Sequence, residues 1–151
     1  MRYIVASALA LTVVTSLGWA ETVKPMNVMF EDGTVGNSLT GEPGDAENGR
    51  KVFMNRKLGN CLACHTNTDL DDQPFHGEVG PPLDGVADRW EEAEMRAIVA
   101  NSKMVFPDTI MPAFYIDSGY TRALEKFEGK SILNAQQVED IVAYLMTLKE
   151  E

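Results

Sequence analysis

The sequence predicts an all-α protein with one folded domain. Three segments, at roughly 45–55, 88–102 and 134–148, carry apolar residues at helical spacing behind residues that can cap a helix. No segment shows the alternation of apolar and polar residues that a half-buried strand requires. The chain has 151 residues, which suggests a single domain.

Residues 1–20 have the pattern of a secretory signal peptide. Arg2 supplies a basic start, Ile4 to Leu17 form an apolar run, and Gly18 and Ala20 are small residues at the positions that a signal peptidase reads. We expect cleavage after Ala20. An uncleaved membrane anchor is the alternative, but this run is shorter than the roughly 20 residues of a membrane span. We therefore expect no membrane span after cleavage.

The remaining chain is acidic. Loss of residues 1–20 removes Arg2 from the 13 basic residues and none of the 23 acidic ones, so the net charge changes from −10 to −11. This charge argues against binding of nucleic acid or anionic lipid. It suits docking to a basic partner, and it equally suits a protein that only needs to stay soluble.

Residues 21–43 precede the first predicted helix and form an extended N-terminal arm, ahead of a folded domain at 44–151. The arm contains apolar residues that could pack on a partner subunit. A disordered leader, or an arm packed on its own domain, fits the sequence equally well. These apolar residues are Met26, Val28, Met29, Phe30 and Val35.

The first helix is expected to begin behind Asp45, a good N-cap residue. It contains Gly49, although glycine inside a helix costs about 1 kcal/mol relative to alanine. A close crossing with the last helix, with Tyr144 packed into the gap, would explain this glycine. A merely tolerated glycine is the alternative.

The segment Cys61-Leu62-Ala63-Cys64-His65 has the C-x-x-C-H spacing of a c-type haem attachment site, and it holds both cysteines of the chain. Two thiols three positions apart can each form a thioether with one vinyl group of a haem, and the next residue then supplies the proximal imidazole. A disulfide or a thiol redox motif is possible in an exported protein. Thiol oxidoreductases can carry the same spacing, but they usually have an aromatic residue before the first cysteine. Here Gly59 and Asn60 precede it, and no βαβ pattern surrounds it. A zinc site lacks a nearby fourth ligand of the usual spacing. We expect one covalently attached haem c.

The second axial ligand is expected to be Met111. It lies in a loop directly before Pro112, which favours an extended backbone at Met111. His76 follows His65 by only eleven residues, so we assign it to a surface loop. The other methionines are assigned to the arm, to helices or to their ends: Met26, Met29, Met54, Met95, Met104 and Met146.

The segment Gly80-Pro81-Pro82-Leu83 predicts a rigid turn after the attachment site. The proximal histidine needs an acceptor for its other ring nitrogen, and the carbonyl group of Pro81 is our candidate. A plain turn is the alternative. We expect the preceding loop, 66–79, to be solvated, with Asp69, Asp71 and Asp72 either simply exposed or close enough to the haem edge to select a basic partner.

Two further helices complete the prediction. Residues 88–91 resemble a capping box that opens a helix to about 102, with Met95, Ile98 and Val99 on its apolar side. Asn134 can open the last helix. The buried stripe expected of that helix is Val138, Ile141, Val142 and Leu145.

Together these motifs resemble class I cytochrome c over about residues 44–149. The resemblance implies a small all-α fold around one haem, with His65 and Met111 as the axial ligands. A narrower resemblance is to the SoxX family, the smaller cytochrome subunits of the SoxAX complexes of sulfur-oxidising bacteria. The segments that carry it are 39–65, 74–90, 97–103 and 108–115.

The SoxX resemblance implies partners and a pathway. A member pairs in the periplasm with a larger haem subunit, SoxA, and the complex couples thiosulfate oxidatively to a cysteine of the carrier SoxYZ, an L-cysteine S-thiosulfotransferase activity. This chain would accept the electrons and pass them to a downstream cytochrome c, without catalytic residues of its own. A free periplasmic electron carrier is the alternative, and a haem peroxidase would need a vacant or displaceable sixth ligand.

Overall fold

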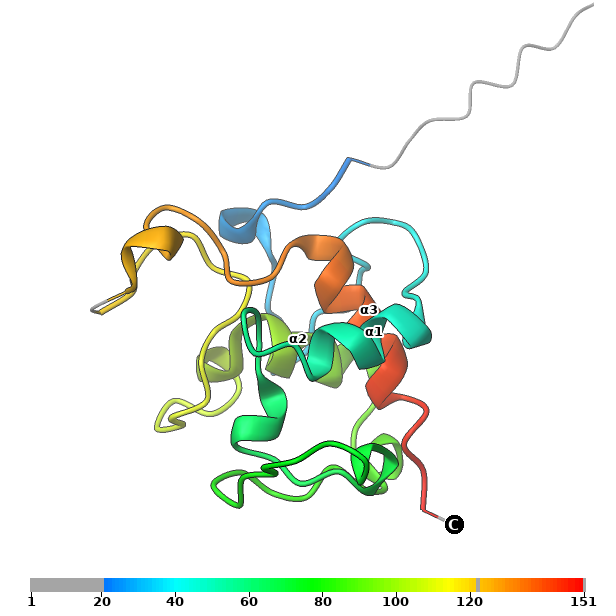
Figure 1. Ribbon diagram of the computed structural model, residues 1–151. Coiled ribbons are helices and arrows are strands. Elements are labelled where there is room, and N and C mark those ends of the chain that lie inside the picture. Colours follow the sequence, from blue (N-terminus) through cyan, green and yellow to red (C-terminus); the bar gives the residue numbers. More distant parts are fainter. Residues whose placement is uncertain (1–20, 122, 151) are drawn as a thin grey trace, which may run out of the picture.

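The computed structural model describes residues 21–121 and 123–150 and shows helices and long connecting loops around one core (Figure 1). The three α-helices of the described residues are α1 (Ala46–Phe53), α2 (Glu92–Asn101) and α3 (Ala135–Leu145). In the described part of the chain there is no strand, only an isolated bridge between Glu31 and Thr34. The all-α prediction is therefore confirmed. Short 3₁₀ turns lie at η1 (Pro25–Asn27), η2 (Cys61–Ala63), η3 (Thr68–Leu70), η4 (Val86–Asp88), η5 (Ser102–Met104) and η6 (Glu125–Phe127).

The predicted signal peptide at 1–20 lies outside the described residues. Within 21–121 and 123–150, no helix has the length and apolar character needed to cross a bilayer.

Helices α1 and α3 begin where the sequence predicts. The carboxylate of Asp45 accepts hydrogen bonds from the backbone N–H groups of Glu47 and Asn48. Asn134 and Gln137 form a reciprocal capping box at the start of α3. These caps satisfy backbone donors that have no partner inside the first turn of a helix.

The predicted start of α2 is wrong by about three residues. The helix begins after Glu91, whose backbone N–H donates to the Glu94 carboxylate at 2.8 Å. Asp88 closes the separate turn η4, and its carboxylate accepts a hydrogen bond from the backbone N–H of Glu150 at 2.6 Å. The Asp88 carboxylate thus binds the backbone near the C-terminus and does not cap α2.

Helices α1 and α3 cross in close contact, as the sequence predicts. A Cβ atom at Gly49 would lie 1.9 Å from the carbonyl oxygen of Asp140 and 2.8 Å from the Cβ of Tyr144. The rings of Phe53 and Tyr144 meet edge to face with centroids 5.5 Å apart. The predicted stripe of α3 is buried in full: Val138, Ile141, Val142 and Leu145.

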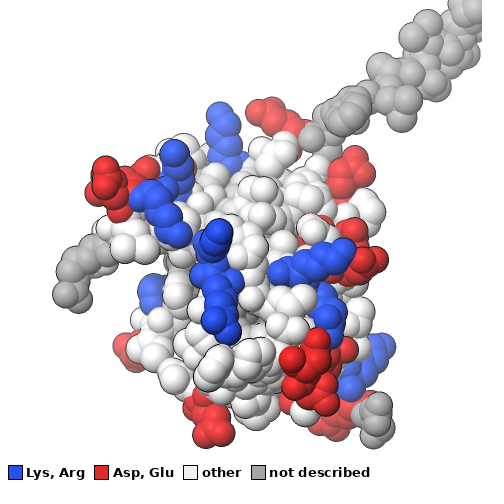
Figure 2. Space-filling view, in the orientation of Figure 1, with Lys and Arg blue, Asp and Glu red and all other residues white. Residues whose placement is uncertain are grey.

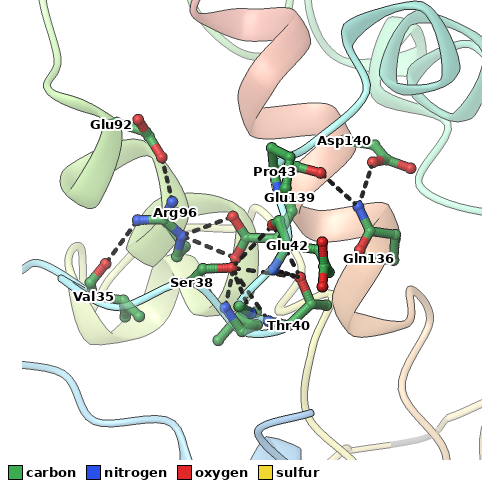
Figure 3. A network of polar contacts seen from close by, with 12 residues as sticks. Val35, Ser38, Thr40, Glu42, Pro43, Glu92, Arg96, Gln136, Glu139 and Asp140 are labelled. Atoms are coloured by element: carbon green, nitrogen blue, oxygen red, sulfur yellow. Dashed lines mark hydrogen bonds and ion pairs between the residues drawn. The ribbon is translucent and has the colours of Figure 1, made fainter. Parts of the chain in front are cut away.

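A buried ion pair joins α2 to α3 and holds the N-terminal arm (Figure 3). Arg96 is 4% and Glu139 3% exposed, and Nε of Arg96 lies 2.9 Å from Oε1 of Glu139. Arg96 also donates to the carbonyl oxygen of Val35 at 3.0 Å, and Oε1 of Glu139 accepts from the N–H of Leu39 at 2.8 Å. Removing one partner of such a pair typically costs about 3–5 kcal/mol, because the other charge stays buried.

The arm therefore packs on its own domain for much of its length. Val35 and Leu39 belong to the core, and Val23 accepts a hydrogen bond from the hydroxyl of Tyr115 at 2.6 Å. Met26 and Met29 are exceptions, at 77% and 72% exposed. The large apolar side chains that the arm leaves exposed are thus these two methionines.

Gly49→Ala should destabilise the protein by about 1–3 kcal/mol, the usual cost of overpacking, because its methyl group would meet the backbone of α3. Denaturant unfolding of the haem-loaded protein measures this change. Gly36→Ala is the matched control, since a Cβ at Gly36 meets no atom within 4 Å. Equal midpoints for the two variants would contradict the close crossing.

Candidate functional site

The two cysteines and His65 lie around the single turn η2. This turn begins after Asn60, which has a left-handed backbone (φ 49°). The backbone N–H of His65 donates to the carbonyl oxygen of Cys61 at 3.0 Å, which closes the five-residue motif on itself. Both thiols are free. The turn thus brings together the three side chains that the sequence predicts as the haem attachment site.

Burial raises the pKa of the Cys61 thiol to about 12. A thiol with a pKa this high keeps its proton at neutral pH, whereas a redox-active cysteine needs a thiolate. This environment disfavours the thiolate form of Cys61.

The chain after the motif returns and runs beside it. Three backbone hydrogen bonds join the two segments: Gly77 N–H to Leu62 at 2.8 Å, Gly80 N–H to Cys64 at 2.7 Å, and Leu83 N–H to Thr66 at 3.0 Å. A Cβ at Gly77 would lie 2.0 Å from the carbonyl oxygen of Ala63, so only glycine permits this approach. The proline turn is thereby held at a fixed position beside His65.

Nδ1 of His65 lies 2.8 Å from the carbonyl oxygen of Pro81. A carbonyl can only accept, so in the neutral ring Nδ1 carries the proton and Nε2 keeps its lone pair. A Cβ at Gly80 would lie 2.3 Å from Cε1 of the same ring. The imidazole is therefore held by Pro81 and closely flanked by Gly80.

His76 is half-buried, and both of its ring nitrogens have partners within the loop. Nε2 lies 2.9 Å from the carbonyl oxygen of Leu70, and the backbone N–H of Asn67 donates to Nδ1 at 3.4 Å. This histidine closes the loop 66–79 and does not offer a free nitrogen to a metal.

The loop also contains a polar network that sequence reasoning missed. The hydroxyl of Tyr144 donates to Oδ2 of Asp69 at 2.7 Å and accepts from the amide of the fully buried Asn67 at 2.9 Å. Arg50 donates to the same carboxylate oxygen at 2.9 Å. Asp69 is therefore not simply solvated, as the sequence suggested. Its hydrogen bond from Tyr144, and then Arg50, lower its pKa.

Met111 is partly buried and packs against the core. Its neighbour Ile110 is 78% exposed, so successive residues of this loop face inward and outward. The loop follows α2 in sequence, and the motif at 61–65 belongs to a different part of the chain. A thioether and an imidazole are a donor pair that suits haem iron.

The cytochrome c family model matches residues 46–149. The chain belongs to the cytochrome c family. Among solved structures it is similar to a chain of "Crystal structure of SoxXA from P. pantotrophus", with 49% sequence identity and a TM-score of 0.80. The match covers 85% of this chain and 99% of that chain. No curated protein matches. The predictions of a class I cytochrome c fold and of a SoxX-like cytochrome are confirmed.

Membership of this family means that the protein carries a covalently bound haem c. The residues present fit the group. The free thiols of Cys61 and Cys64 flank one turn, the ring of His65 is held by Pro81, and Gly80 leaves room for that ring.

Gly80→Ala should displace the imidazole of His65 from the carbonyl oxygen of Pro81, because the added methyl group overlaps the ring. We expect a high-spin component in the ferric absorption spectrum, because the bond between a displaced imidazole and the haem iron would be weaker. Gly36→Ala again serves as the control and should leave the spectrum unchanged. A spectrum of Gly80→Ala identical to that of the parent would contradict the close contact between Gly80 and the His65 ring.

Asp69→Asn should destabilise the protein at neutral pH, and the difference from the parent should shrink in acid. The folded-state pKa of Asp69 is lowered, so its stabilising effect is complete above the ordinary carboxyl pKa of about 3.9 and is lost as the pH falls through the lower folded value. Chemical unfolding at a series of pH values measures this difference. Asp71→Asn is the control, because Asp71 forms no ion pair with the described residues. A difference between Asp69→Asn and the parent that is independent of pH would refute the role of the ionised carboxylate.

Proposed function

We propose that this chain is the electron-accepting subunit of a two-cytochrome complex that couples thiosulfate oxidatively to a cysteine of a carrier protein. The observation that carries the proposal is the 49% identity to a chain of SoxXA, over 99% of that chain. The complex as a whole would be an L-cysteine S-thiosulfotransferase. This chain contributes electron transfer to it, and a SoxA-like subunit contributes the site of the chemistry.

We assign the cofactor-binding residues as follows. Cys61 and Cys64 would form the two thioether bonds to the haem, and Nε2 of His65 and the sulfur of Met111 would ligate its iron. Pro81 accepts the hydrogen bond from Nδ1 of His65, which fixes the ring and raises its basicity. When bound, the haem supplies a one-electron couple.

The cysteine content of the chain and the proposed ligand pair support electron transfer over substrate chemistry. The only cysteines of the sequence lie in the haem motif, so no further thiol is available to bond with thiosulfate. Met111 as the sixth ligand leaves no open coordination position for a substrate. A histidine and methionine ligand pair also raises the reduction potential, which suits an acceptor of electrons.

The surface charge is compatible with protein partners of either sign. On the face that carries α1, Lys and Arg side chains lie across the middle, and Asp and Glu side chains lie nearer the outline (Figure 2). The cations in and just after α1 are Arg50, Lys51, Arg56 and Lys57. The net charge of −10 is therefore unevenly distributed, and it does not by itself select a basic partner.

The proposed setting is the periplasm, reached through the signal sequence at 1–20. There the chain would form a heterodimer with a SoxA-like cytochrome, act with a SoxYZ-like carrier, and pass electrons to a downstream cytochrome c.

Affinity capture tests this proposal. The protein, tagged at its C-terminus, is recovered from its native cells growing on thiosulfate, and bound proteins are examined by haem staining and mass spectrometry. We expect a second c-type cytochrome in equal amount. Recovery of the haem protein alone at low salt would contradict the proposal and favour a free electron carrier.

A further inference from the structure

The loop that carries Met111 is fastened to the end of α2 by a buried hydroxyl group. Ser102 directly follows α2 and is 0% exposed. Its hydroxyl donates to the carbonyl oxygen of Met111 at 2.8 Å and lies 3.3 Å from that of Pro112. A fully buried hydroxyl is costly unless it is paired, and here its partner is the backbone of Met111 itself.

Lys103 binds the same loop from the solvent side. Its ammonium group donates to the carbonyl oxygen of Thr109 at 2.8 Å and to that of Met111 at 3.1 Å. The carbonyl oxygen of Met111 therefore has two donors, one for each of its lone pairs. Ordering a long lysine side chain costs entropy, so these bonds must offset that cost.

Two further hydrogen bonds hold the backbone on either side of Met111. Its backbone N–H donates to the hydroxyl of Thr109 at 3.2 Å. Further along, the N–H of Tyr115 donates to the carbonyl oxygen of Ala100, inside α2, at 2.8 Å. The loop is thus attached to the C-terminal end of α2 on both sides of Met111.

This attachment determines which way the side chains of the loop point. Ile110 is 78% exposed, whereas Met111 packs against the core. A rotation of the backbone at Met111 would exchange these directions, and it would break the bonds of Ser102 and Lys103 together.

We propose that Ser102 and Lys103 are positioning residues that keep the thioether of Met111 in place as the sixth ligand. The inference rests on the ligand assignment of the proposed function. A loop that opens more often exposes the iron more often, so an external ligand binds with an apparent affinity proportional to the open fraction. The two side chains set that fraction.

Imidazole binding to the ferric protein tests the proposal. Ser102→Ala and Lys103→Met should each bind imidazole about five-fold more tightly than the parent, within the roughly 2- to 10-fold range that one net hydrogen bond provides. The red charge-transfer band of the methionine–iron bond should disappear at correspondingly lower imidazole concentration.

Two control variants separate positioning from general stability. Thr147→Ala removes an exposed residue's hydroxyl, which donates to the backbone carbonyl oxygen of Tyr144 at 2.6 Å. Lys130→Met removes a lysine whose side chain forms no ion pair in the described part of the chain. Both should bind imidazole as the parent does. If Ser102→Ala does not fold, Lys103→Met carries the test, because Lys103 is exposed.

Met111→Ala distinguishes failure of this inference from failure of the ligand assignment. Loss of the charge-transfer band in Met111→Ala, with parental imidazole affinity in Ser102→Ala and Lys103→Met, overturns the positioning role alone. An unchanged band in Met111→Ala overturns the ligand assignment and the positioning role with it. The ligand assignment and the positioning role are both supported if Met111→Ala loses the band and if Ser102→Ala and Lys103→Met, but not the two control variants, bind imidazole more tightly than the parent.

Discussion

The contact between α1 and α3 at Gly49 is the constraint on which the surroundings of His65 depend. With only hydrogen at Gly49, the backbone of α3 comes close enough for Tyr144 to pack on Phe53 and extend its hydroxyl to Asp69 and Asn67. That network anchors the loop after the haem motif. The returning segment then carries the carbonyl group that holds His65.

The loop of Met111 depends on a different support. Helix α2 is tied to α3 through the buried pair of Arg96 and Glu139, which also binds the N-terminal arm. The loop of Met111 is attached to the end of the same helix. The two proposed axial ligands therefore belong to different loops. The loop of His65 is held by the contact between α1 and α3, and the loop of Met111 is held by the end of α2. A rigid frame suits electron transfer, because little needs to move when the oxidation state changes.

The sequence predicts the features that are encoded locally. Asp45 and Asn134 cap helices because their side chains reach donors two or three residues away, and the five-residue haem motif is likewise local. Two long-range contacts escaped prediction. Asp69 looked like one more acidic loop residue, and Asp88 looked like a helix cap, but their partners, Tyr144 and the backbone of Glu150, lie 75 and 62 positions away. The pairing of Gly49 with Tyr144 was predictable because a helical glycine needs an explanation.

Nuclear magnetic resonance of methionine methyl groups tests the central claim, the ligation of the iron by Met111, most directly. The reduced protein is labelled at these methyl groups, of which seven remain after Met1 is set aside from the eight methionines. The account predicts one strongly upfield-shifted methyl signal, produced by the ring current of the haem, and its loss in Met111→Ala alone. A spectrum without such a signal, or a signal that is lost on replacing another methionine, would contradict the account.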